Sequence, residues 1–215
     1  MMTIGAVLTG DLIASTDATH DDVDDAMAVL STAAMRVSDW VNTSTRFTRF
    51  RGDGWQMFLS DPSLTLRCCL FLIASLRASN IGLTTRISVG IGNTDRLGQA
   101  SLSDASGEAF IISGHGLDHM AKSKRLDIAG AGDLNIWQMA IFDLVAWQSG
   151  RWSREQAEAA MIALEPGINA QAEIAARLGI TRQAVQARLN TAGIPALQNA
   201  LRAFERASCT KGVLP

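Results

Sequence analysis

Two aspartates flanked by glycines are the residues of this sequence whose types and spacing best suit phosphate and metal chemistry. Asp11 follows Gly10, and Asp53 lies between Gly52 and Gly54. Carboxylate oxygens bind Mg²⁺ or Mn²⁺, and such ions hold nucleotide phosphates for transfer reactions. Glycines on either side allow a phosphate to approach the backbone closely. The alternative is ordinary turn chemistry, in which Asp and Gly serve only the chain reversal.

The elements around these aspartates alternate between strand and helix. Ile4–Thr9 predicts a buried strand that ends in a turn at Gly10-Asp11, and apolar residues spaced by three and four predict a helix from Val23. Arg46–Phe50 and Trp55–Leu59 predict two strands joined in a hairpin. Because the first strand and this hairpin are neighbours in palm-type sheets, we expect the two aspartates to meet at one end of the sheet.

The rest of the first 148 residues continues the alternation. We expect, in order, a helix opened by Asp61-Pro62 and ending near Ser79, a strand Thr84–Ile91, a helix from Gly107 to about Lys124, a short strand Leu126–Ile128 and a helix Asn135–Trp147. The order β-α-β-β-α-β-α predicts an α+β fold, a ferredoxin-like or palm sheet with helices on one face. We assign residues 1–148 to this domain.

The charge of the chain divides at the same place. Residues 1–150 carry 11 Lys and Arg against 16 Asp and Glu, and residues 151–215 carry 8 against 5, so net charges of −5 and +3 add to the −2 of the 215-residue chain. An acidic body followed by a basic helical segment indicates two modules with different partners. We therefore assign residues 152–215 to a second, all-helical domain.

This second region has the pattern of a helix-turn-helix. Helices are predicted over Ala170–Leu178 and Arg182–Asn190, with Gly179 in the turn and Thr181 as the cap of the second helix. The predicted outward side chains of that helix suit phosphates and base edges in a major groove: Arg182, Gln183, Gln186 and Arg188. We expect DNA as a partner, although helix-turn-helices also serve packing or dimerisation alone.

Composition excludes several other classes. A chain that is 47% hydrophobic and 19% charged has ample apolar mass for a packed core. No apolar run approaches the roughly 20 residues of a membrane span, and the first residues lack a signal peptide. Three cysteines do not make a disulfide framework. We expect a cytoplasmic protein with no membrane partner.

Several short segments occur in a recognisable order. They are Leu8–Ser15 (LTGDLIAS), Phe50–Gln56 (FRGDGWQ), Arg86–Gly92 (RISVGIG), Gly107–Phe110 (GEAF) and Lys122. Over about residues 4–205 the chain resembles the SatD-like bacterial proteins, a family that also carries a C-terminal helix-turn-helix. The resemblance implies a nucleotide-cyclase-like domain joined to a DNA-binding module.

The same segments resemble, more distantly, the class III nucleotide cyclases. There an aspartate after the first strand and one in a Gly-Asp-Gly hairpin bind two metal ions, which implies that role for Asp11 and Asp53. The nucleotide would then lie near their glycines and near Arg51, whose alternative role is charge balance for the aspartates. Where cyclases carry Asn and Arg on a later helix, this sequence has Ile111 and His115.

Three functions follow as hypotheses. The first is a dimeric DNA-binding transcription regulator whose palm-like domain senses a nucleotide through a divalent ion, since an isolated site of this size would bind DNA weakly. The second is a Mg²⁺- or Mn²⁺-dependent nucleotidyl cyclase or nucleotidyltransferase. The third is an inactive scaffold. A stripe of Leu197, Leu201 and Phe204 on the last helix could form the dimer interface or belong to the core.

Overall fold

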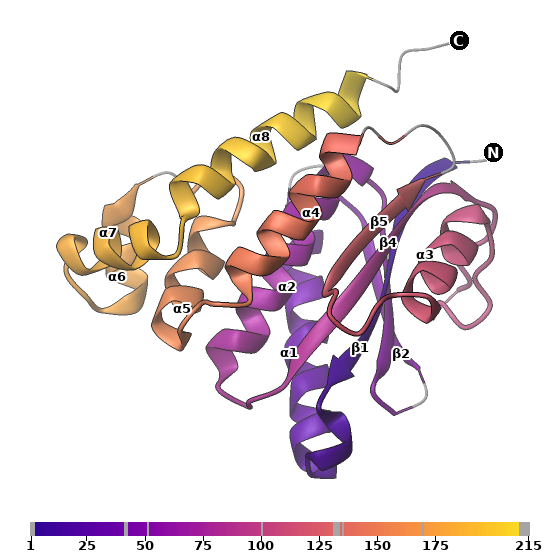
Figure 1. Ribbon diagram of the computed structural model, residues 1–215, viewed down its shortest axis with the longest axis horizontal. Helices are drawn as coiled ribbons and strands as arrows, with labels where there is room; N and C mark the ends of the chain where they lie inside the picture. Colours follow the sequence, from indigo (N-terminus) through magenta and orange to yellow (C-terminus); the bar gives the residue numbers. More distant parts are fainter. Residues whose placement is uncertain are drawn as a thin grey trace.

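A mixed sheet of five strands lies at the centre of the molecule (Figure 1). This computed structural model describes residues 3–40, 43–50, 52–99, 101–130, 134, 136–168 and 170–210. The strands stand in the order β2-β3-β1-β4-β5, and the β4–β5 pair alone is parallel. Their bounds are β1 Thr3–Ile13, β2 Thr45–Phe50, β3 Gly54–Leu59, β4 Thr84–Thr94 and β5 Leu126–Gly130.

The first strand is longer than its apolar segment predicts. β1 pairs with β3 along one edge and with β4 along the other, and both ladders run through Asp11. The predicted turn at Gly10-Asp11 is therefore wrong, because pairing on both sides keeps the chain extended to Ile13. Asp11 consequently lies on a face of the sheet, the one shared with Val7 and Thr9.

Eight α-helices and two short 3₁₀ helices complete the described chain. The 3₁₀ helices are η1 Ser15–Asp17 and η2 Pro62–Leu64, and the α-helices are α1 His20–Ser38, α2 Thr65–Ser79, α3 Glu108–Asp118, α4 Ile136–Ser149, α5 Arg154–Ala163, α6 Gln171–Leu178, α7 Arg182–Thr191 and α8 Ile194–Thr210. Of these, no helix combines the length and apolar character needed to cross a membrane.

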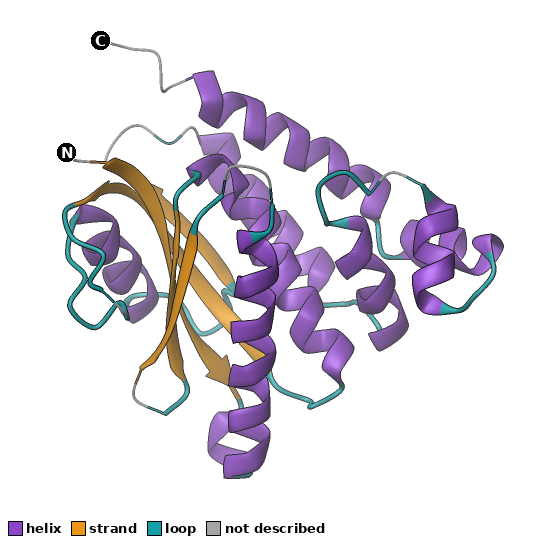
Figure 2. Ribbon diagram, turned by 180° about the vertical axis from the view of Figure 1, so that it is seen from behind, coloured by secondary structure: helices purple, strands orange, loops and turns teal. Residues whose placement is uncertain are grey.

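The helices cover both faces of the sheet, which differs from the prediction of one covered face (Figure 2). α1 and α2 pack on the face that carries Leu8 and Leu12, whereas α3 packs on the opposite face, where Ala109 contacts the apolar cluster of Val7 and Phe58. Glycine makes this second packing possible. A Cβ at Gly90 would lie 2.3 Å from the carbonyl oxygen of Ala109, so α3 can approach only a bare backbone.

Local capping signals set where the first two helices begin. Thr19 accepts a hydrogen bond from the backbone of Asp22, and the Asp22 side chain accepts one from Thr19, so α1 starts at His20 rather than at Val23. Asp61 caps the next helical segment, which opens as η2 before it becomes α2. The predicted cap and proline are confirmed, and the helix ends at Ser79 as expected.

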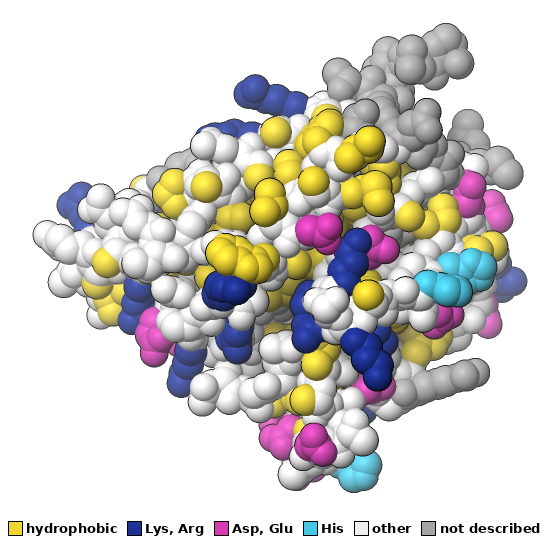
Figure 3. Space-filling model, viewed as in Figure 1, with side chains coloured by type: hydrophobic (Ala, Val, Ile, Leu, Met, Phe, Trp, Pro, Cys, Tyr) yellow, Lys and Arg dark blue, Asp and Glu magenta, His cyan; other side chains and the backbone are white. Residues whose placement is uncertain are grey.

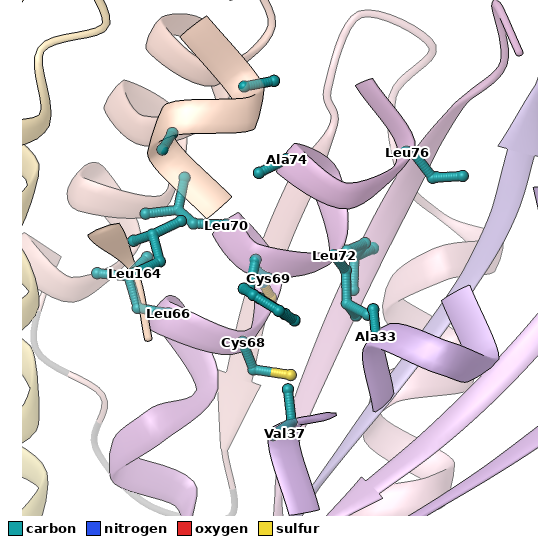
Figure 4. Packing of buried hydrophobic residues seen from close by; sticks show 14 of the residues in the cluster. Ala33, Val37, Leu66, Cys68, Cys69, Leu70, Leu72, Ala74, Leu76 and Leu164 are labelled. Carbon is teal, nitrogen blue, oxygen red and sulfur yellow. The ribbon is translucent and has the colours of Figure 1, made fainter. Parts of the chain in front are cut away.

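α2 is buried on two sides, which joins the helical second half to the sheet. Figure 4 shows Cys68 and Leu72 directed toward Ala33 and Val37 of α1, while Leu66 and Leu70 lie beside Leu164, the residue that caps the end of α5. All these side chains belong to one continuous apolar cluster. Burial raises the pKa of the Cys68 thiol, so this cysteine serves the core.

The last helix returns to the sheet domain. Leu197, Leu201 and Phe204 of α8 are buried, and the Phe204 ring lies 5.7 Å from that of Phe142 in α4. The stripe therefore belongs to the core, which was one of the two roles considered for it. Arg67 of α2 also forms an ion pair with Glu205, at 2.7 Å.

Candidate functional site

The structure brings Asp11 and Asp53 to the same end of the sheet. Asp11 stands opposite Gly54 in the β1–β3 ladder, so it is one position from Asp53 across the strands. The backbone N–H of Leu12 donates to the Asp53 carbonyl at 3.1 Å, which ties the hairpin turn to β1. The two aspartates, 42 positions apart in sequence, thus become neighbours as the palm-type arrangement predicts.

The carboxylate of Asp11 is held by Arg86, which stands beside it in the β1–β4 ladder. The guanidinium donates from Nε to Oδ1 at 2.7 Å and from Nη2 to Oδ2 at 2.6 Å, a bidentate pair. Both side chains are about one quarter exposed, at 28% for Arg86 and 25% for Asp11. The hydrogen bonds that Arg86 donates to Asp11, with further attraction from Asp118 and Asp53, raise the pKa of Arg86.

Asp53 is held from the opposite direction by Ser15. Beyond β1 the backbone turns at Ala14, whose φ of 65° is left-handed, and enters η1. This turn places the Ser15 hydroxyl where it donates to Asp53 Oδ2 at 2.5 Å. Asp53 therefore keeps one carboxylate oxygen without a described hydrogen bond, whereas both oxygens of Asp11 are engaged.

This donor arrangement bears directly on the predicted metal ions. Mg²⁺ needs carboxylate oxygens that are free to coordinate it. Arg86 engages both oxygens of Asp11, and within the described ranges no group of three or more His, Cys, Asp or Glu could hold a metal ion. As arranged, Asp11 is not available to an ion, because the Arg86 guanidinium engages both of its oxygens and a metal ion would have to displace it, whereas Asp53 keeps one oxygen without a described hydrogen bond.

The three glycines assigned to nucleotide contact have different surroundings. Gly10 is buried, and a Cβ there would lie 2.5 Å from the indole ring of Trp55, so this glycine serves core packing and cannot meet a phosphate. Gly52 is exposed with φ +80 and open space around it, and Gly54 is half-buried. Arg51, the fourth candidate, lies outside the described residues.

The helix that carries the catalytic Asn and Arg in cyclases offers no comparable groups here. Ile111 of α3 is 60% exposed, and His115 is also exposed. The buried polar side chain that α3 directs at the sheet is Ser113, whose hydroxyl is 2.8 Å from that of Thr9, and the Glu108 side chain lies against Gly92 of β4. α3 thus provides a packing contact and no fixed cation for a developing phosphoryl charge.

A second candidate surface is formed by α6 and α7, at the end of the molecule away from the sheet (Figure 1). Gly179 ends α6 with a left-handed φ of 65°, and the Thr181 hydroxyl caps α7 by accepting from the backbone of Ala184 at 3.2 Å. Ile174 and Val185 are buried between the two helices. The predicted helix, tight turn and capped second helix are therefore present, with α5 packed against them.

The exposed side of α7 carries three of the predicted contact residues. Arg182, Gln183 and Gln186 are exposed, and none of their side chains has a hydrogen bond or ion pair to another described residue. Thr181 is exposed as well, with its hydroxyl engaged in the cap. Free polar side chains on the first two turns of a helix form a surface that can bind an external partner.

Arg188 does not belong to this surface, contrary to the prediction. Its guanidinium turns back to α5, where it pairs with Glu158 at 3.3 Å and donates to the Glu155 carbonyl at 3.4 Å. Its side chain is 26% exposed. Arg188 follows Gln186 by two positions, which rotates it about 200° around the helix, so it points toward the helical core.

Sequence reasoning missed Arg86 and Ser15 as members of the aspartate site. A signal for Arg86 was present, because Ile87 and Val89 are core residues and the alternation of a strand places Arg86 on the other face. What the pattern could not supply was the register of β4 against β1, which aligns Arg86 with Asp11. Ser15 depends on the left-handed turn at Ala14, an uncommon residue there.

Among known proteins, no protein-family model matches the chain, and no curated protein matches it significantly.

Proposed function

We propose that this protein is a DNA-binding regulator that contacts DNA through α7. The observation that carries the proposal is the group of free side chains, Arg182, Gln183 and Gln186, at the N-terminal end of a capped second helix. Arginine pairs with guanine edges and with phosphates, and glutamine pairs with adenine edges. The net charge of +3 on residues 151–215 supports the same partner.

Fluorescence anisotropy of the full chain with labelled genomic fragments, at stated salt concentrations, tests this proposal. We expect Arg182→Ala with Gln186→Ala to weaken specific binding about 10-fold or more, since each base contact contributes about 1–3 kcal/mol. Arg202→Ala is the matched control, because Arg202 is exposed on α8 and, among the residues that the structure describes, bonds only Asn199 of its own helix. Equal binding of all sequences, unchanged in the double variant, would contradict the proposal.

A second proposal concerns the aspartate site, where a nucleotide with Mg²⁺ or Mn²⁺ would bind to Asp11 and Asp53. It is supported by the neighbouring backbone positions of the two aspartates and by the open space at Gly52. Binding there requires Arg86 to leave Asp11, after which its guanidinium could contact a phosphate. This would make the sheet domain a ligand sensor for the regulator, in keeping with the resemblance to SatD-like proteins and cyclases.

A thermal-shift screen with the four nucleoside triphosphates and Mn²⁺ tests the second proposal. A ligand that binds the folded chain and not the unfolded chain should raise the melting temperature, and Asp53→Asn should remove that rise. Release of pyrophosphate in the same mixtures would favour a nucleotidyl cyclase or nucleotidyltransferase over a sensor. The absence of both stabilisation and turnover would contradict this proposal and would favour the scaffold role for the sheet domain.

A further inference from the structure

The outer face of α4 is an apolar surface that nothing in the described chain covers. Five of its large side chains are exposed: Ile136 by 86%, Leu144 by 67%, Trp147 by 58%, Met139 by 42% and Trp137 by 38%. Figure 3 shows apolar side chains gathered over this helix. The inner face of α4 buries Phe142 and Val145 beside the polar Gln138 and Ser149, so large apolar side chains lie on both faces of this helix. Apolar side chains on both faces are typical of a helix that is covered on both.

The size of this surface matches the centre of a protein interface. Five large apolar side chains on one helix expose on the order of several hundred Å², near the upper end for a monomer. A stable interface buries about 800 Å² on each partner, of which the centre is apolar and the rim polar. The α4 surface therefore supplies the apolar centre, and the surrounding polar residues supply the rim.

The charges next to this surface are already matched within the chain. α4 contains no Lys or Arg, and its one acidic residue, Asp143, pairs with Lys124 at 3.5 Å. Arg151, just beyond the helix, lies over the Trp147 ring at 3.8 Å. A lipid surface would call for a basic polar face on the helix. A neutral, apolar protein surface is the partner that this face fits.

The exposed side chains of α4 are complementary to those of a second, antiparallel copy of the same helix. In an antiparallel pair of helices related by a two-fold axis at the level of Phe142, Ala140 of one copy lies opposite Leu144 of the other. The same axis sets Trp137 opposite Trp147, an aromatic pair at each end. A small residue opposite a large one allows close approach, and the two helix dipoles oppose each other favourably. We propose that α4 is the interface through which two copies of this chain form a symmetric dimer.

No other described surface competes with α4 for this role. The stripe on α8 is buried against the rest of the chain. The remaining exposed large apolar residues, Ile4, Met35 and Ile111, stand singly on β1, α1 and α3. The α4 dimer goes beyond the proposed DNA binding and does not depend on it, although a two-fold pair would present two copies of α7 to two half-sites.

Sedimentation equilibrium of the full chain over a dilution series tests the proposal. We expect a dimer, and we expect Leu144→Glu to raise its dissociation constant about 30-fold or more, as for a central interface residue. Ile111→Glu is the matched control, a similarly exposed aliphatic residue on α3, and should leave the dimer unchanged. A monomeric unmodified chain, or a Leu144→Glu variant that dimerises normally, would overturn the proposal.

A charge pair tests the two-fold geometry itself. Ala140→Glu and Leu144→Lys should each be monomeric alone, because each buries two unpaired charges in its own dimer. An equimolar mixture should restore the dimer, since the introduced carboxylate of one copy then faces the introduced ammonium of the other. Failure of the mixture to dimerise would refute the antiparallel pairing.

Tryptophan fluorescence of the unmodified chain keeps the test independent of the folding of any variant. Dilution through the dissociation midpoint should shift the emission to the red as Trp147 and Trp137 become exposed, and Trp147→Phe should reduce this shift. Dimers that dissociate without a shift place the interface elsewhere and overturn the proposal. All these outcomes are read without DNA, so they are distinguishable from a failure of the proposed function.

Discussion

Arg86 decides what the aspartate site can do in the ligand-free chain. Its bidentate contact with Asp11 supplies the positive charge that a divalent ion would otherwise bring. The pair is partly exposed, so solvent screening limits its contribution to stability. Arg86 therefore has a modest structural role, and in the proposed exchange a divalent metal ion would replace its guanidinium at Asp11.

Removing Arg86 should separate these roles. We expect Arg86→Ala to lower the free energy of unfolding by about 1–2 kcal/mol in metal-free buffer, because Asp11 loses two charge-assisted hydrogen bonds. Added Mg²⁺ or Mn²⁺ should then raise the melting temperature of the variant and leave that of the unmodified chain unchanged. Urea unfolding and thermal denaturation measure the two effects.

Arg49→Ala is a suitable comparison for that experiment. Arg49 pairs with Asp24 and donates to the Gly52 carbonyl, but the two paired side chains are more exposed, at 40% and 64%, so we expect a loss below about 1 kcal/mol. Should Arg86→Ala gain no stability from either ion, the exchange of cations at Asp11 would be refuted, and the pair would be purely structural.

Among the elements, α8 is held to the rest of the chain by one buried apolar side. Phe204 is fully buried against Phe142, and its loss would leave a large cavity between α4 and α8. We expect Phe204→Ala to cost about 3–5 kcal/mol in urea unfolding. Arg202→Ala, on the exposed side of the same helix, should change stability by less than about 0.5 kcal/mol. Equal effects of the two changes would place α8 outside the core.

The bounds of many elements could be predicted because their signals are local. Thr181 and Gly179 fix the ends of α7 and α6 within a few residues, and Asp61 with Pro62 does the same for the segment that leads into α2. The far end of β1 could not be predicted. Its last residues are extended because β3 and β4 pair with them, and these strands are distant in sequence.

Local signals also could not predict which faces of the sheet are covered by helices. α3 packs opposite α1 and α2 because Gly90 of β4 leaves room for it, a contact that joins elements about 20 residues apart. The adjacency of Asp11 and Asp53 followed from the order of strands, whereas the Arg86 contact followed from a register that joins residues 75 positions apart. The order of the elements can be predicted from the hydrophobic pattern of the sequence. The register of one strand against another is known only once the sheet has formed.

For the molecule as a whole, the helical second half is packed onto the first. α5 covers Leu66 and Leu70 of α2, and Arg36 of α1 forms an ion pair with Glu165 just beyond α5. Arg177 of α6 pairs with the same Glu165, at 2.7 Å. The charge distribution predicts a boundary at residues 148–152, and the two parts of the chain on either side of it share a large apolar contact.

A fragment of residues 1–150 tests the strength of that contact. We expect it to aggregate and to bind a hydrophobic dye, because it exposes the apolar side of α2 that α5 and Leu164 cover. Adding a peptide of residues 151–215 should reduce both signals. A monomeric fragment that unfolds cooperatively at the melting temperature of the full chain would show that the first domain is stable alone.

Trp152 has a consequence for any regulation of the exposed surface of α7. Its indole N–H donates to the carbonyl of Ala192, at the end of α7, and Gln148 donates to the same oxygen. These two hydrogen bonds fasten the end of α7 to the α4–α5 junction, so a movement of α7 relative to that junction would have to break them. If α7 binds DNA and α4 pairs two chains, as proposed, a ligand of the sheet domain would change DNA occupancy by shifting how pairs of chains assemble, and occupancy would rise steeply with protein concentration.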